Sequence, residues 1–218
     1  MLIQEAKWFG EQLCLLESQL VFPMCNVGSS TAVFRTREQP WIDKLIFAPL
    51  LRRGHAFTHL DIKPEPGVDI VGDLGDAMFL KRVSNMHFKS VFCSNLLEHV
   101  VERDDICRTL LSIIPSGGFL FISVPFSFPY HPDPIDTSFR PTVEELVASF
   151  PGTRLVHSAV VVGERFWKLR SRNLITFTLT LVRCLMPFYK PVGWWRNRGY
   201  LTWFFRRVSA TCVVLHKD

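Results

Sequence analysis

Seven short apolar runs with strand character recur along the chain, and the segments between the early runs are long enough for helices. The runs cover residues 20–25, 55–60, 68–71, 88–94, 118–124, 155–162 and 209–215. Strands that alternate with helices form a parallel sheet covered by helices on both faces. The sequence therefore predicts an α/β fold with one central sheet.

The N-terminal segment predicts an amphipathic helix over residues 1–18. Its apolar residues recur at helical spacing: Leu2, Ala6, Phe9, Leu13 and Leu16. Four charged residues interrupt any apolar run there: Glu5, Lys7, Glu11 and Glu17. This pattern is not typical of a signal peptide.

Three more helices follow from spacing and capping signals. Residues 37–52 and 96–113 have helical character, although prolines restrict the first of these segments. Thr142 and Glu145 have the spacing of a capping box, which predicts a helix that begins after Thr142. With 218 residues, of which 48% are hydrophobic, the chain is expected to form a single domain, 1–218, with a substantial core.

Small residues follow the first apolar run. Gly28, Ser30 and Ala32 stand at every second position of residues 26–32, and Asp61 ends the next apolar run. Small side chains allow a ligand or a helix to approach the backbone. The order of strand, tight turn, helix, strand and acid is typical of nucleotide sites at the carboxyl ends of parallel strands. An ordinary strand-to-helix loop is the structural alternative.

Charge is unevenly distributed along the chain. Residues 164–207 contain ten basic residues and one acid, a net charge of +9, whereas the rest of the chain has a net charge of −4. The same segment contains four of the six tryptophans. We therefore expect a mildly acidic domain with a basic, aromatic insertion at 164–207 before the last strand.

The six cysteines are scattered and form no C-x-x-C pair: Cys14, Cys25, Cys93, Cys107, Cys184 and Cys212. Most of them lie in apolar segments, where they are expected to be reduced core residues of a cytoplasmic protein. Neither disulfides nor a metal site is expected from them.

Four segments together resemble class I S-adenosylmethionine (SAM)-dependent methyltransferases of the type 11 kind. They are residues 26–32, Asp61, residues 68–74 with Asp73, and residues 88–100 followed by 114–125. The last pair is specific for the family, whereas the first alone is weak. The resemblance implies a Rossmann-like doubly wound sheet of seven strands, with the last strand antiparallel, and SAM across the carboxyl ends of the first strands.

The resemblance also implies roles for individual residues. Gly28 would let the backbone approach the methionine and ribose of SAM, and Asp61 would accept both ribose hydroxyls. Asp73 would accept a hydrogen bond from the adenine amino group. Ser94 and Asn95 would line the edge nearest the methyl donor. The implied activity is methyl transfer to a small-molecule, glycan or lipid-linked acceptor.

The first motif departs from the family at three positions. Asn26 replaces an acid, and Ser30 and Ala32 replace glycines. Asn26 still offers a carbonyl oxygen to an ammonium group, but a neutral hydrogen bond is about half as strong as a charge-assisted one. A non-catalytic scaffold or regulatory module with this fold, at a membrane surface, is therefore the alternative function. A nicotinamide dehydrogenase fits less well, because Ser30 and Val33 break its glycine pattern.

Residues 125–136 follow the fifth apolar run and are expected at the rim of the site. Four prolines stiffen this loop, which also presents a histidine, a tyrosine and two aspartates. If the acceptor is a hydroxyl group, a base is useful, and His131 is the first candidate, followed by His99 and Asp133. His131 and Asp133 alone are too few ligands for a metal. A structural proline-rich corner is the alternative for this loop. Glu98 is a further catalytic candidate beside His99, and the alternatives are a favourable interaction of Glu98 with the helix dipole and simple packing of His99.

The insertion at 164–207 has several interpretations. Its longest apolar stretch, Leu174 to Val182, is far shorter than the ~20 residues that span a bilayer. Tryptophans, phenylalanines and arginines fit the headgroup layer of an anionic membrane, and we favour that interpretation over nucleic-acid binding. A lid over the acceptor or an oligomer interface is the alternative. The expected location is cytoplasmic, peripheral at the inner membrane face.

Overall fold

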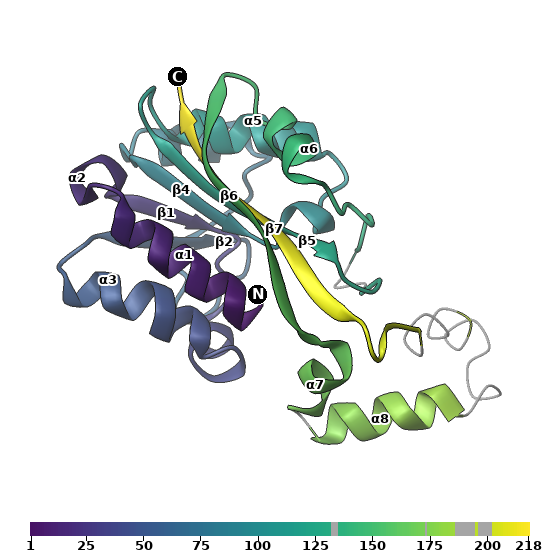
Figure 1. Cartoon of the computed structure of the whole chain (residues 1–218). Helices are drawn as coiled ribbons and strands as arrows, with labels where there is room; N and C mark the ends of the chain where they lie inside the picture. Colours follow the sequence, from purple (N-terminus) through teal and green to yellow (C-terminus); the bar gives the residue numbers. More distant parts are fainter. Residues whose placement is uncertain (132–134, 173, 186–194, 196–201) are drawn as a thin grey trace.

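The computed structural model describes residues 1–131, 135–172, 174–185, 195 and 202–218. The described residues form one seven-stranded sheet in the order β3-β2-β1-β4-β5-β7-β6. All neighbouring strands are parallel except β7, which is antiparallel to both β5 and β6. The strands are β1 (Met24–Val27), β2 (Phe57–Asp61), β3 (Ile70–Val71), β4 (Ser90–Ser94), β5 (Phe119–Ser127), β6 (Thr153–Arg165) and β7 (Arg207–Lys217) (Figure 1). The predicted Rossmann-like α/β architecture with an antiparallel last strand is confirmed.

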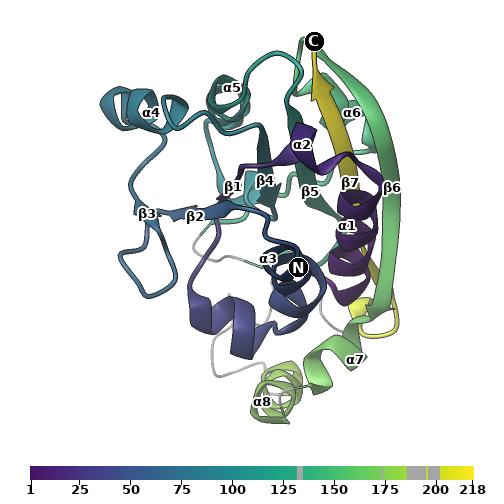
Figure 2. The ribbon, with the colours of Figure 1, turned by 90° about the vertical axis from the view of Figure 1, so that its left-hand side faces the viewer.

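Helices cover both faces of the sheet. The α-helices are α1 (Ile3–Leu15), α2 (Ser18–Val21), α3 (Ala48–Arg52), α4 (Ala77–Ser84), α5 (Arg103–Ile113), α6 (Val143–Ala148), α7 (Phe166–Ser171) and α8 (Leu174–Leu185). Two π-helical segments, Phe34–Glu38 and Asp43–Phe47, and a 3-10 turn, Leu97–His99, complete the described helices. Figure 2 shows α4 and α5 on one side of the sheet and α1 and α3 on the other.

Alternate residues of the central strands point to opposite faces of the sheet, and an apolar core lies on each face. On one face, Val91, Cys93 and Leu120 pack with residues of α4, α5 and α6. On the other face, Phe92 and Phe121 pack with α1, the segment around α3, and β7. Both faces of the sheet are thus buried, as expected for a parallel sheet between helices.

The strand order reverses direction between β1 and β4. The chain runs from β1 outward to β2 and β3, then returns to β4 on the other side of β1. Such a switch point leaves a crevice outside the carboxyl ends of the two central strands. Gly28, which follows β1, and Asn95, which follows β4, both lie at this crevice.

The position predicted for the first strand from its apolar run is wrong. Residues 20–25 were expected to be extended, but Leu20 and Val21 end helix α2 and the strand is Met24–Val27. Pro23 has no amide hydrogen for a sheet hydrogen bond, so the ladder begins at Met24. As a consequence, Asn26 lies within β1.

The helix predicted over 96–113 is also corrected, because α5 begins only at Arg103. Residues Leu97–His99 form a separate 3-10 turn, and Val100 is extended. The Glu98 carbonyl accepts hydrogen bonds from the backbone N–H and the hydroxyl of Thr137, at 2.8 and 3.0 Å. That carbonyl is therefore unavailable to a helix that continues from Glu98, and tertiary contacts override the local pattern.

Other helical predictions are close to the structure. The helix expected over 37–52 is interrupted at Gln39 and Pro40, and Pro49 follows the second π-helical segment. A missing amide at each proline accounts for these irregularities. The capping box of Thr142 and Glu145 is present at the start of α6. The helix predicted over 1–18 is α1, followed by the short α2.

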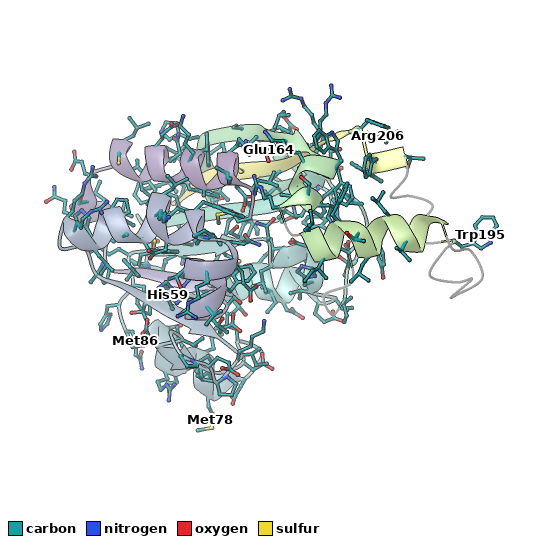
Figure 3. All side chains as sticks on the ribbon, turned by 90° about the horizontal axis from the view of Figure 1, so that it is seen from below. His59, Met78, Met86, Glu164, Trp195 and Arg206 are labelled. Atoms are coloured by element: carbon teal, nitrogen blue, oxygen red, sulfur yellow. The ribbon has the colours of Figure 1, made fainter. Side chains whose placement is uncertain are left out.

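The segment 164–207 begins in β6 and ends at β7, and its described part includes α7 and α8. These helices lie beyond one end of the sheet (Figure 1). Figure 3 shows Glu164 near the sheet and Trp195 far from it, beyond helix α8. No helix in the described part of the chain is long and apolar enough to cross a membrane. Trp194, Arg196 and Arg198 of the predicted membrane element lie outside the described residues.

Candidate functional site

A cavity of about 1040 Å³ lies at the carboxyl ends of β1, β2 and β4. Eight of the residues predicted to form the site line it: Asn26, Gly28, Ser30, Asp61, Ser94, Asn95, His99 and His131. Asp73 is not among the described lining residues, and Asp133 lies outside the described residues. The volume is at the upper end of the range for one drug-sized ligand, about 300–1,000 Å³, so a cofactor and a small acceptor fit together.

The turn after β1 is held by Asp61 at the end of β2. Gly28 has φ +66° and Ser30 has φ +54°, so the chain passes twice through the left-handed region. One Asp61 carboxylate oxygen accepts the Ser30 amide at 2.7 Å, and the other accepts the Lys63 amide at 3.1 Å. Asp61 is only 9% exposed and faces the cavity, with further lone pairs for ligand hydroxyls.

Arg35 also stabilises this turn through hydrogen bonds. The sequence analysis did not identify this role of Arg35. Its guanidinium donates to the carbonyls of Ser29 and Ser30, at 2.9 and 2.6 Å, and to the Gly67 carbonyl at 2.5 Å. Only 5% of Arg35 is exposed. This side chain therefore joins the turn after β1 to the loop between β2 and β3. An arginine in the first turn of a helix gives no sequence signal of such a role.

Asn26 pairs with a neutral histidine on β2. The Asn26 amide nitrogen lies 2.9 Å from His59 Nδ1. Burial, together with the nearby Arg35 charge, lowers the pKa of His59 to about 4. His59 is therefore neutral near pH 7 and accepts the Asn26 N–H through Nδ1. The Asn26 carbonyl oxygen is left to face another partner, which keeps the predicted contact with an ammonium group open.

Glu5 of α1 reaches the carboxyl ends of β4 and β5. One of its carboxylate oxygens accepts hydrogen bonds from Ser94, Asn95 and Ser123, at 3.0, 2.8 and 2.5 Å. The other accepts the Leu2 amide at 2.9 Å. Glu5 is fully buried yet lines the cavity. It lies on the apolar face of the predicted helix, next to Ala6, and a charge on that face was the signal that the sequence analysis overlooked.

Glu98, His99 and His131 form a cluster on the cavity wall. One ligand atom from each residue lies within 4.8 Å of the others, and His99 Nε2 is 3.7 Å from a Glu98 oxygen. Glu98 is fully buried, and neither of its carboxylate oxygens has a hydrogen-bond partner among the described residues. Burial raises the pKa of Glu98 to about 7. Burial also lowers the pKa of His131.

A second layer holds the two imidazoles of this cluster. His99 Nδ1 bonds the Ile135 carbonyl. His131 Nδ1 is 3.2 Å from both the Pro129 carbonyl and an Asp136 oxygen. Asp136 is in turn held by both terminal nitrogens of Arg140, at 3.1 and 2.7 Å. Arg140 thus pairs with Asp136 and orients its carboxylate.

Asp73 occupies a different environment from the other predicted residues. It is exposed, and its carboxylate accepts the Gly75 amide at 2.8 Å within a turn before α4. Its contact with an adenine group stays a prediction. The other site residues converge on the cavity because they end neighbouring parallel strands, whereas Asp73 follows the edge strand β3.

Helix α7 closes one side of the cavity. Phe166, Leu169 and Arg172 contribute to its lining. The Arg172 guanidinium stacks over the Trp41 ring at 5.0 Å and pairs with Glu164 at 2.6 Å. Part of the basic insertion therefore lines the site, and the lid interpretation of 164–207 stays a prediction.

Comparisons with known proteins find the same fold in solved structures of SAM-dependent methyltransferases. No family model matches the sequence, and no curated protein matches it significantly. Solved structures do match the fold. Coclaurine N-methyltransferase, bound to N-methylheliamine and S-adenosylhomocysteine (SAH), has a TM-score of 0.54 and 12% identity, over 89% of this chain and 65% of its own.

Two further structures match over nearly the whole chain. Loganic acid methyltransferase with SAH has a TM-score of 0.54 and 11% identity, over 99% of this chain and 93% of its own. Magnesium protoporphyrin IX methyltransferase from Synechocystis PCC 6803 with bound SAM has a TM-score of 0.52 and 11% identity, over 99% and 79%. The chain has the class I methyltransferase fold, and at these identities the likeness concerns the fold alone.

Proposed function

We propose that this chain is a SAM-dependent methyltransferase that acts on a small-molecule acceptor. One observation carries the proposal: the cavity at the β1–β4 switch point is lined together by Gly28, Asp61 and Asn95. These are three of the residues for which the sequence resemblance implies contacts with SAM. Structures of the same fold with SAM or SAH bound support this choice of cofactor.

The cavity offers charged groups of both signs to SAM. The ligand has a sulfonium and an ammonium against one carboxylate, a net charge of +1. Four carboxylates line the cavity, Glu5, Glu38, Asp61 and Glu98, together with the basic side chains Arg35, Lys63, Arg170 and Arg172. In this proposal Asp61 accepts the ribose hydroxyls, and the Asn26 carbonyl and the Glu5 network lie on the methionine side.

Methyl transfer itself needs little from the protein beyond alignment and the exclusion of water. A lone pair of the acceptor attacks the methyl carbon, the carbon–sulfur bond breaks toward sulfur, and SAH leaves. A hydroxyl acceptor must also lose its proton. We place that acceptor atom at the cluster of Glu98, His99 and His131, with His131 as the first candidate for handling the proton.

Calorimetry with SAM and with SAH tests the proposal. We expect both to bind the wild-type protein, and Asp61→Asn to weaken binding about 10-fold to 100-fold, because one of two charge-assisted acceptors becomes an amide donor. The matched control is Asp104→Asn, since Asp104 is exposed on α5 and does not line the cavity. Absence of binding of either ligand at millimolar concentration would favour the non-catalytic scaffold instead.

Transfer of a labelled methyl group from SAM into small-molecule and cell-envelope extracts identifies the acceptor. The basic side chains of Lys63, Arg170 and Arg172 in the cavity lining favour an anionic, glycan or lipid-linked acceptor. His131→Ala is expected to lower turnover with little change in SAM affinity. An equal loss of SAM binding in that variant would place His131 on the cofactor side.

Helix α8 supports a peripheral membrane contact. Leu174 and Ile175 are 76% and 73% exposed, and Leu179, Leu181 and Val182 are exposed on the same arc of the helix. On another side of α8, Phe177 packs against Phe204 at a ring distance of 6.1 Å. Arg170 and Arg172, which precede α8 in the chain, add positive charge. An apolar arc beside basic residues is typical of a helix that lies in the membrane interface.

Flotation with anionic and with neutral liposomes tests this contact. We expect the protein to float with anionic vesicles and the double variant Ile175→Glu/Leu179→Glu to lose that binding. Leu51→Glu is the control, because Leu51 is 59% exposed on α3, outside the insertion. Equal flotation of the wild type and the α8 variant would rule out α8 as the membrane element.

A further inference from the structure

The cluster of Glu98, His99 and His131 has a chemistry that methyl transfer alone does not explain. Glu98 carries two carboxylate oxygens with no hydrogen-bond partner among the described residues, although the side chain is fully buried. A buried carboxylate costs several kcal/mol unless it is paired or coordinates a metal, as a rough estimate. The two buried oxygens without hydrogen-bond partners are therefore available to a cation.

The two imidazoles are oriented as metal ligands. A carbonyl oxygen only accepts hydrogen bonds, so the contact of His99 Nδ1 with the Ile135 carbonyl places the proton on Nδ1. The Pro129 carbonyl and the Asp136 carboxylate do the same for His131 Nδ1. Both rings are then left with an unprotonated Nε2. Metal-bound histidines almost always donate their other N–H to a carbonyl or carboxylate in this way.

Asp136 is itself held in place. Arg140 donates to both Asp136 oxygens, and the amides of His131 and Ser138 donate at 2.9 and 2.8 Å. With these four hydrogen bonds the carboxylate is fixed, and it in turn fixes the ring of His131, as in a carboxylate–histidine–metal arrangement.

We propose that Glu98, His99 and His131 bind one divalent transition-metal cation, with Zn²⁺ as the expected occupant. One carboxylate and two imidazoles suit Zn²⁺, which is held in catalytic sites by three protein ligands and keeps a position open. Ligand atoms around Zn²⁺ lie about 3–3.5 Å apart, given bond lengths near 2.1 Å. The ligand atoms lie within 4.8 Å of one another, so small side-chain rotations bring them to bonding distance.

The open position faces the cavity in which the proposed function places the acceptor. A hydroxyl or carboxylate oxygen of the acceptor would occupy it, and the cation would lower the pKa of a bound hydroxyl. With the cation bound, His131 acts as a metal ligand, and the proton leaves to solvent rather than to His131. This role rests on the proposed function, whereas binding of the cation does not.

Metal titration without SAM tests the site directly. The protein is stripped with a chelator and titrated with ZnCl₂ by calorimetry and with CoCl₂ by visible absorption. We expect one cation per chain and a tetrahedral or five-coordinate Co²⁺ spectrum. Glu98→Gln should weaken Zn²⁺ binding at least ~10-fold, and Asp136→Asn about 10-fold to 100-fold, the usual cost of losing a supporting group.

The variants include controls for folding and for unspecific binding. Glu98→Gln replaces a buried carboxylate that has no hydrogen-bond partner among the described residues with a neutral group of the same shape, so it is expected to fold. His87→Asn is the matched histidine control, because His87 is exposed and does not line the cavity. Absence of saturable Zn²⁺ binding by the wild type, or equal binding by wild type and Glu98→Gln, would overturn the proposal. Metal binding without SAM binding would refute the proposed function and leave the metal site standing, and the reverse result would do the opposite.

Discussion

Substitution of Arg35 tests most directly what stabilises the turn after β1. Replacing it with alanine removes three hydrogen bonds to carbonyls, of lengths 2.9, 2.6 and 2.5 Å, at a position that is 5% exposed. A hydrogen bond to a charged group contributes about 1.5–3 kcal/mol. Three such bonds set an upper limit of roughly 4–9 kcal/mol, from which the desolvation of the guanidinium must be subtracted.

We therefore expect Arg35→Ala to lower the free energy of unfolding by about 3–5 kcal/mol, a large part of the stability of a single domain. Arg35→Lys keeps a charge but loses the fork that reaches three carbonyls, so its loss should be intermediate. The same variants should weaken SAM binding, because Ser29 and Ser30 belong to the proposed cofactor turn.

Urea unfolding followed by circular dichroism measures these changes. Arg37→Ala is the control, since Arg37 lies in the same helical segment but is exposed, and exposed substitutions usually change stability by less than about 0.5 kcal/mol. If Arg35→Ala unfolds within about 1 kcal/mol of Arg37→Ala, the three hydrogen bonds do not hold the turn and the reasoning fails.

Two further predictions concern His59 and Glu5. The pKa of His59 is lowered from 6.5 to about 4, so between these pH values the unfolded chain binds more protons and stability falls as the pH falls. This shift corresponds to a loss of about 3 kcal/mol over that window. His59→Asn keeps an acceptor near Nδ1 and should flatten the acid limb of stability against pH; an unchanged limb would contradict the assigned pKa. Glu5→Ala leaves four donors without their acceptor and should cost about 2–4 kcal/mol in urea unfolding. Glu11→Ala, on the exposed side of α1, should cost little, and equal losses in both would mean that the Glu5 network contributes nothing.

Periodicity was sufficient for the architecture but not for where elements begin. Alternating apolar runs predicted the parallel sheet, because burial on both faces requires continuous apolar strands. Because of Pro23, the first strand begins later than its apolar run predicts. The hydrogen bonds from Thr137 to the Glu98 carbonyl prevent the continuous helix predicted over 96–113. The second effect comes from a residue about 40 positions away, and no local pattern contains it.

The site shows the same division. Asn26, Gly28, Asp61 and Asn95 meet because they end adjacent parallel strands, which strand order alone implies. Glu5 and Arg35 enter from helices, and their roles depend on how those helices pack on the sheet. For Glu98, the sequence left two interpretations open: a catalytic role, or a favourable position at the start of a helix. Its unpaired buried carboxylate is a property of the folded chain.

The substitution at Asn26 does not by itself argue against cofactor binding. In the sequence alone, an amide in place of an acid removes a negative charge from the methionine side of the site. In the folded chain that amide donates to the neutral His59, and its carbonyl oxygen is left for a ligand. The carboxylates of Glu5 and Glu98 line the same cavity. The amide therefore removes a negative charge from β1 but keeps an acceptor oxygen there, while acidic side chains from α1 and from the turn after β4 also reach the cavity.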